Sequence, residues 1–273
     1  MPNKSLLYRF LAGGIILLTF ASCKPMHKVS SKSYVGKEFE TESGLKYTIQ
    51  KAGQGERAEI GKIVVVNYVG MLTDSSVFDN SYGKGKAFRF ELGAGKVIKG
   101  WDEGIALLNV GDSATLILPP HLGYGSKENA RIPANSTLIF NVKLEDVLHP
   151  AAEWDPGKAD TTQIQDGLSI IWLKKNEDGK KPQRGNSVLV HYSGYFRNGK
   201  KFDSSVDKGD PITFPIGQGM VIQGWDLGIS QLRKGEKAKL LISPELGYGS
   251  RGYYNFIPPN ANLIFDVELL EVY

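Results

Sequence analysis

The chain of 273 residues contains one cysteine and four histidines. A single thiol excludes an internal disulfide framework, and no Cys/His cluster has the spacing of a metal site. The sequence also lacks a glycine-rich phosphate loop ahead of a helix and a nucleophile elbow. It therefore does not contain the catalytic motifs of the common hydrolases and transferases. We therefore expect neither a cofactor nor a metal. The net charge is only +4, and the scattered basic residues argue against nucleic-acid binding.

Long apolar runs are absent except near the N-terminus. Residues Leu11–Phe20 form a run of signal-peptide length that is too short to span a bilayer comfortably. It leads into Ala21-Ser22-Cys23, and small residues before a cysteine resemble the lipobox of bacterial lipoproteins. We expect residues 1–22 to be a signal peptide and Cys23 to be lipidated. The alternative is a plain secretory signal with an incidental cysteine. Phe20 departs from the leucine that is more common at its position.

The expected lipidation determines the predicted location. Acyl chains on Cys23 would anchor the protein stably to a membrane in the bacterial cell envelope. Because Lys24 rather than aspartate follows the cysteine, the resemblance to enteric lipoproteins implies the outer membrane, on its periplasmic or surface face. Residues 23–40 are polar without apolar periodicity, which predicts a flexible tether.

The remainder of the chain is a long internal duplication. The segment 97–106 (VIKGWDEGIA) recurs as 221–230 (VIQGWDLGIS), an offset of 124 residues. The offset becomes 125 near the C-terminus, where Phe140 recurs as Phe265. A period of this length indicates two equivalent domains rather than a solenoid of short repeats. The matched residues are Tyr68, Gly70, Phe78, Asp79, Phe90, Trp101, Gly111 and Tyr124 with Tyr192, Gly194, Phe202, Asp203, Phe214, Trp225, Gly235 and Tyr248.

We place the two domains at residues 41–149 and 161–273, joined by a proline-containing linker at 150–160. Apolar residues alternate in several segments of each repeat, most clearly in 138–144 and 263–269, as in half-buried strands. One short stretch per repeat has a helical pattern, 101–108 and 225–232, and ends before a glycine that can cap it. The fold class is therefore α+β, with an antiparallel sheet around one short helix in each domain. Within the linker, we expect Trp154 to pack against one domain.

The residues that the two repeats share are mostly apolar and aromatic. Taken singly, each is more often a core residue than a site residue. Tyr124, however, lies in a glycine-flanked loop, and Asp79 places a carboxylate directly after Phe78. Trp101 begins the predicted helix, where its ring could form a pocket floor. The pattern indicates an apolar pocket with a few polar groups. His191 is replaced by Asn67 in the first repeat, which favours a structural role for it.

These motifs resemble the FKBP-type peptidyl-prolyl cis–trans isomerases. The resemblance rests on Tyr-x-Gly, Phe-Asp, Val-Ile-x-Gly-Trp, Gly-Tyr-Gly, Ile-Pro and a terminal Leu-Ile-Phe-Asn/Asp-Val strand, each present in both repeats. It covers nearly all of the chain beyond the tether and implies two half-barrels, each with a helix across its mouth. It also implies proline-containing polypeptide clients and inhibition by macrolides of the FKBP type.

Site residues follow from the resemblance, position by position. It implies that Trp101 lies under the proline ring, that the Ile98 amide and the Tyr124 hydroxyl hold substrate carbonyls, and that Asp79 orients Tyr68. The first site then comprises Tyr68, Phe78, Asp79, Phe88, Val97, Ile98, Trp101, Tyr124, Phe140 and the flap residue Ile132. The second comprises Tyr192, Phe202, Asp203, Ile212, Val221, Ile222, Trp225, Tyr248, Phe265 and Ile257.

The sequence departs from the family pattern at three places. Lys84 and Lys208 stand where family members often carry arginine, so a bidentate pair with the aspartate is expected to be lost. Ile212 replaces Phe88 in the second domain, and the flap there is more apolar. We therefore expect two unequal pockets that differ in substrate preference.

Two functions are compatible with these residues. The first is a prolyl isomerase that assists the folding of exported or envelope proteins. The second is a non-catalytic peptide-binding chaperone or adaptor that uses one or both pockets. Inactive relatives typically lose the tryptophan, the aspartate or the loop tyrosine, and the retention of all three in both repeats favours the enzyme.

Overall fold

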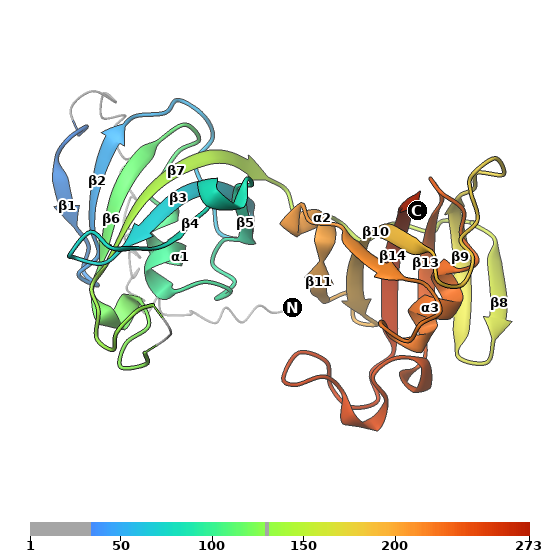
Figure 1. Cartoon of the computed structure of the whole chain (residues 1–273). Coiled ribbons are helices and arrows are strands. Elements are labelled where there is room, and N and C mark those ends of the chain that lie inside the picture. Colours follow the sequence, from blue (N-terminus) through green and yellow to red (C-terminus); the bar gives the residue numbers. More distant parts are fainter. Residues whose placement is uncertain (1–33, 129–130) are drawn as a thin grey trace, which may run out of the picture.

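The computed structural model describes residues 34–128 and 131–273 of the chain (Figure 1). The predicted signal peptide, Cys23 and most of the predicted tether lie outside these residues. Within the described part, the helices are too short or too polar to cross a membrane.

The first domain is a seven-stranded antiparallel sheet. Its strands run in the order β1-β2-β6-β7-β3-β4, and β5 also pairs with β3. They are β1 (Glu38–Glu40), β2 (Lys46–Lys51), β3 (Ile63–Met71), β4 (Val77–Asn80), β5 (Phe88–Glu91), β6 (Ser113–Leu118) and β7 (Leu138–Leu148). Helix α1 (Lys99–Ile105) lies inside the curve of this sheet (Figure 1). Short 3-10 turns, η1 (Tyr82–Lys84) and η2 (Pro120–Leu122), lie in the connections.

The second domain repeats this architecture with the order β11-β10-β14-β13-β9-β8, and β12 also pairs with β10. Its strands are β8 (Thr161–Gln165), β9 (Leu168–Lys174), β10 (Ser187–Phe196), β11 (Lys201–Ser204), β12 (Ile212–Pro215), β13 (Lys237–Ile242) and β14 (Leu263–Val272). Its helices are α2 (Ser205–Lys208) and α3 (Gln223–Ile229), with 3-10 turns η3 (Pro244–Leu246) and η4 (Gly249–Arg251). The predicted α+β class, with one antiparallel sheet wrapped on a short helix per domain, is confirmed.

Alternation along the strands explains why each sheet covers its helix. In β7, Leu138, Phe140, Val142 and Leu144 are buried and contact the same core as Trp101. The helix approaches β6 closely because it presents glycine there. A Cβ atom on Gly100 would lie 2.4 Å from the Leu118 side chain. The small helix face therefore brings the indole of Trp101 down onto the sheet.

Three local features differ from the sequence-based expectation. Each main helix begins two residues earlier and ends three residues earlier than predicted, because the chain after Ile105 continues in i→i+3 turns rather than α-helical ones. The short helix α2 was not predicted. Strand β1 lies within the predicted tether of residues 23–40 and pairs with β2, so the sheet begins earlier than expected.

The segment between the sheets is attached to the second domain. The Ala151 amide donates a hydrogen bond to Asp207 at 2.6 Å, and the Trp154 amide donates to Asp266 at 2.7 Å. The Trp154 ring lies 5.3 Å beneath the Lys237 ammonium group, a cation–π contact. Residues 151–154 are therefore part of the surface of the second domain rather than a free spacer.

Candidate active site

The first domain has a cavity of about 290 Å³ at the mouth of its half-barrel. Strands β3, β4, β5 and β7, helix α1 and the loop after η2 all contribute side chains. Of the ten residues assigned from the sequence, the structure brings nine together around this cavity. The lining residues are Tyr68, Phe78, Asp79, Lys84, Phe88, Lys96, Val97, Ile98, Trp101, Tyr124 and Phe140.

The indole of Trp101 forms the bottom of the cavity and is held by edge-to-face contacts. Its ring centroid lies 4.9 Å from that of Tyr68 and 5.3 Å from that of Phe140, with nearly perpendicular planes. Such contacts fix ring orientation and add to the stabilisation from burial. The Trp101 Nε1 group is buried and has no hydrogen-bond partner among the described residues. The floor is therefore rigid and predominantly apolar.

One wall carries a hydrogen-bonded group of polar residues. The Tyr68 hydroxyl donates to Oδ2 of Asp79 at 2.6 Å, and Lys84 Nζ lies 2.6 Å from Oδ1 and 2.9 Å from Oδ2 of the same carboxylate. Lysine thus contacts both oxygens at the position where arginine is common. Burial and the bond to the Asp79 carboxylate raise the pKa of Tyr68 to about 12. Burial opposes ionisation of Asp79, but the bonds from Lys84 and Tyr68 outweigh it and lower its pKa.

Hydrogen-bond donors at the rim are available to a ligand. Ile98 is the N-cap residue of α1, and its amide N–H makes no hydrogen bond to any described residue. Tyr124 lies on the loop after η2, and its side chain is substantially exposed. Neither group makes a hydrogen bond to another described residue, so both are available to donate to a ligand.

The second domain holds an equivalent cavity of about 200 Å³. The Tyr192 hydroxyl donates to Oδ2 of Asp203 at 2.6 Å, and Lys208 forms an ion pair with the same carboxylate. Burial, followed by the Asp203 hydrogen bond, raises the pKa of Tyr192. The lining residues are Tyr192, Phe202, Asp203, Ile212, Met220, Val221, Ile222, Trp225, Tyr248 and Phe265.

The two pockets differ in wall and rim. Phe88 stacks on Phe90 in the first domain, whereas Ile212 gives the second a smaller wall. The second domain also exposes aromatic rings on its flap, where Tyr254 is 83% and Phe256 is 71% exposed. The second pocket therefore opens onto a more apolar surface.

Two predicted site residues do not line the cavities. Ile132 is 3% exposed and Ile257 is 4% exposed, and both belong to the hydrophobic cores of their domains. Neither is among the residues that line its cavity. Sequence reasoning also missed Lys96 and Met220, which occupy equivalent positions and line the two cavities. Their positions directly before the Val-Ile pair could have indicated this.

His191 lies outside both cavities. Its Nδ1 is 2.9 Å from the Ser205 hydroxyl, and burial lowers its pKa. In the first domain the equivalent contact joins Asn67 to the Ser81 hydroxyl at 2.8 Å. In each domain the pair joins a central strand, β3 or β10, to the residue that begins the short helical turn after the next strand, as expected for a structural residue.

Comparison with known proteins identifies the same protein family in both repeats. The family described as FKBP-type peptidyl-prolyl cis-trans isomerase matches residues 54–145 and 178–270. Peptidyl-prolyl cis-trans isomerase FKBP10 of Mus musculus is 38% identical over 229 residues, 84% of this chain and 37% of that protein. FK506-binding protein 1 of Candida glabrata is 51% identical over 109 residues, 40% of this chain and 96% of that protein.

Among solved structures, FkpA from Escherichia coli is 42% identical, with a TM-score of 0.39, over 41% of this chain and 52% of that chain. The chain spans little more than a third of the length of the FKBP10 relative, although nearly a whole FK506-binding protein fits within one of its repeats. With two family matches that together cover more than half of its residues, the chain belongs to the family of FKBP-type peptidyl-prolyl cis–trans isomerases.

Proposed function

We propose that this protein catalyses cis–trans isomerisation of Xaa-Pro bonds at two sites, one in each domain. The observation that carries the proposal is the repeated arrangement of an indole floor and a Tyr–Asp hydrogen bond at the wall of an aromatic cavity. In both domains this hydrogen bond measures 2.6 Å. If the tryptophan served only to fill the hydrophobic core, a charged aspartate beside it at a solvent-accessible cavity would have no purpose.

The chemistry requires no covalent intermediate. Rotation about a prolyl amide faces a barrier of about 18–20 kcal/mol, because resonance gives the C–N bond partial double-bond character. Water stabilises the planar, polar ground state. A dry aromatic cavity removes that solvation and favours the twisted, less conjugated amide. Lowering the barrier by about 4–8 kcal/mol would support the rates of a typical isomerase.

Each residue has a role in this proposal. The indole of Trp101 lies under the proline ring, and the aromatic walls exclude water. The Ile98 amide and the Tyr124 hydroxyl hold the carbonyl oxygens on either side of the proline. Asp79 keeps the Tyr68 phenol neutral and oriented, because a phenolate beside a carboxylate is strongly disfavoured. The equivalent residues act in the second domain.

The proposed clients are proline-containing segments of exported proteins, and macrolides of the FKBP type would compete for the same pockets. Uncatalysed prolyl isomerisation takes tens of seconds or longer and can limit folding. Lipidation at Cys23 would hold the enzyme at the envelope, where such proteins fold. The residues that support this location are those of the N-terminal motif in the sequence.

The decisive experiment follows cis-to-trans isomerisation of an Xaa-Pro peptide by the full-length protein and by Asp79→Val, Asp203→Val and the double variant. Partial loss in each single variant and near-complete loss in the double variant would support two catalytic sites. Loss in one single variant alone would assign catalysis to that domain. A folded wild-type protein without activity would refute the enzyme and favour a peptide-binding chaperone, for which the exposed Tyr254 and Phe256 of the second domain provide an apolar surface.

A further inference from the structure

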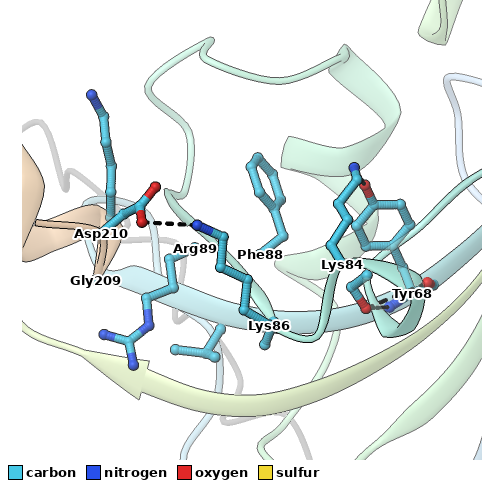
Figure 2. Close-up of a pocket in the computed structure, with 11 residues that line it drawn as sticks. Tyr68, Lys84, Lys86, Phe88, Arg89, Gly209 and Asp210 are labelled. Atoms are coloured by element: carbon cyan, nitrogen blue, oxygen red, sulfur yellow. Dashed lines mark hydrogen bonds and ion pairs between the residues drawn. The ribbon is translucent and has the colours of Figure 1, made fainter. Parts of the chain in front are cut away.

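A third cavity lies where the two domains meet. It has a volume of about 380 Å³ and is formed by β5 and neighbouring residues of the first domain together with residues 208–210 of the second. Figure 2 shows Lys86, Phe88 and Arg89 on one side and Gly209 and Asp210 on the other. Tyr68, Lys84 and Phe88 line both this cavity and the aromatic pocket of the first domain. The junction cavity is therefore a lateral extension of that pocket.

The junction cavity has a surplus of positive charge. It is lined by four cationic side chains, those of Lys84, Lys86, Arg89 and Lys208, and by one carboxylate, that of Asp210. Lys84 and Lys208 are each paired with the aspartate of their own pocket, and Lys86 is paired with Asp210. Among the described residues, the Arg89 guanidinium group makes no hydrogen bond or ion pair, although it also lines a neighbouring junction cavity with the carboxylates of Glu91, Asp203 and Asp207.

The backbone of β5 explains how Arg89 reaches this place. Phe88 and Phe90 stack on each other, and both pack against Trp101, so the residue between them projects from the opposite face of the strand. There Arg89 lies against the backbone of Gly209, where an added Cβ would be only 2.6 Å from its Nη1. Gly209 has a φ of 60° and forms the C-cap of α2. The second domain thus packs against one side of the guanidinium, at the border of the junction cavity.

We propose that the junction cavity binds an acidic side chain of the client polypeptide, close in sequence to the proline held in the pocket of the first domain, and that Arg89 is its receptor. This inference rests on the proposed function and specifies the substrate class of the same site. Because Arg89 is partly exposed and makes no ion pair, an incoming carboxylate can pair with it for a modest gain in binding. The planar guanidinium also matches a carboxylate through two parallel hydrogen bonds.

The geometry assigns this preference to the first domain alone. The position equivalent to Arg89 in the second repeat is Thr213, which cannot supply a charge. Arg89 projects from the opposite face of β5 to Phe88, but the proline pocket and the junction cavity share Tyr68, Lys84 and Phe88, so a client segment bound in the pocket can continue into the junction cavity. The second pocket, with its apolar flap, offers no matching cation at this position.

The test compares pairs of peptides that share one Xaa-Pro core and carry either glutamate or glutamine at one, two or three residues before or after the proline. Binding to the full-length protein is measured by fluorescence anisotropy, and isomerisation is measured in parallel. We expect at least one glutamate position to bind about three- to fivefold tighter than its glutamine counterpart, the range of a partly exposed ion pair. The preference should weaken as salt is added.

Arg89→Gln should reduce the glutamate-to-glutamine ratio to about one, and Arg89→Glu should invert it, so that the glutamine peptide binds more tightly. Arg57→Gln is the matched control, because Arg57 is an exposed cation of the same domain that lines none of the cavities described here. It should retain the full ratio. Equal binding of all glutamate and glutamine pairs, or a preference that survives Arg89→Gln, would overturn the inference.

Its failure can be separated from failure of the proposed function. If glutamine peptides are isomerised but glutamate gives no advantage, the enzyme stands and the acidic subsite falls. If glutamate peptides bind more tightly through Arg89 but no peptide is isomerised, the acidic subsite stands in a binding protein. Absence of both binding and isomerisation refutes both.

Discussion

Lys86 and Asp210 occupy the same position in the two repeats, 124 residues apart, and form an ion pair of 2.8 Å across the domain junction. The duplicated segment therefore carries opposite charges in its two copies, and these charges meet. Each side chain is 60% exposed, so the pair contributes no more than about 1 kcal/mol. Its effect is on how the domains are oriented rather than on how each one folds.

Reversing one of these charges should separate the domains. Lys86→Asp places two carboxylates at the junction, and we expect a larger radius of gyration in small-angle X-ray scattering at low salt. The double variant Lys86→Asp/Asp210→Lys restores opposite charges and should restore the compact arrangement. Thermal unfolding of each domain should change little. Identical scattering for all three proteins would show that the pair does not determine domain orientation.

The Tyr68–Asp79 bond should be visible in an alkaline titration. Because the pKa of Tyr68 is raised to about 12 in the fold, the native state holds this proton more tightly than the unfolded chain, whose tyrosines titrate near 10. The resulting stabilisation is complete below about pH 10 and is lost as the pH rises towards 12. Asp79→Asn removes the carboxylate and should lower the Tyr68 pKa. Ultraviolet difference absorbance of the phenolate measures it, with Tyr68→Phe identifying the signal.

A buried ion pair distinguishes the second domain from the first. Lys239 and Asp266 lie 2.8 Å apart with side chains only 3% and 2% exposed, and burial raises the pKa of Asp266. The equivalent residues of the first domain, Thr115 and Asn141, form a neutral hydrogen bond of 2.8 Å.

Lys239→Thr alone should destabilise the second domain by about 3–5 kcal/mol, since it leaves a buried carboxylate unpaired. Adding Asp266→Asn recreates the pair of the first domain and should recover much of that loss. Calorimetric unfolding of the full-length protein measures both effects, and the transition of the first domain is the internal control. A double variant less stable than Lys239→Thr would contradict the expectation.

Glycine at the wall of each pocket is required by the neighbouring rings. A Cβ on Gly70 would lie 2.7 Å from the Phe140 ring and 2.8 Å from the Phe78 ring. Gly70→Ala should therefore displace aromatic walls, cost about 1–3 kcal/mol in the first domain and reduce peptide binding there. Gly61→Ala is an informative contrast. Gly61, unlike Gly70, has a positive φ of 86°, and no atom lies within 4 Å of its added Cβ. It should lose stability through backbone strain while peptide affinity is unchanged.

The duplication made the site largely predictable. An offset of 124 residues identifies which aromatic residues recur, and the alternation of Leu138 to Leu144 identifies the strand that carries Phe140. The helix boundaries were harder to predict from the sequence. Ile98 caps α1 without a side-chain hydrogen bond, so no polar residue marks the start of the helix. Helix α2 did have such a signal. The Ser204 hydroxyl accepts a hydrogen bond from the Asp207 amide, the pattern of a capping serine.

The junction could not be predicted from the sequence. Lys86, Arg89 and Asp210 resemble ordinary surface charges in the sequence, and only the arrangement of the two domains places them around one cavity. Ile132 illustrates a different limit, because the family pattern implies a pocket residue whereas its side chain packs in the core of the first domain.

The short connection between the sheets has a consequence for how a client meets two pockets. The His149 imidazole is hydrogen-bonded to Lys62 of the first domain, and the Ala151 amide is bonded to Asp207 of the second, so Pro150 alone lies between the two attachments. Proline also fixes its own φ, which leaves this connection little slack. A chain released from one pocket therefore remains at a high effective concentration near the other. If both pockets act as proposed, a client with several prolines would be processed by both of them in a single encounter rather than by separate diffusional collisions.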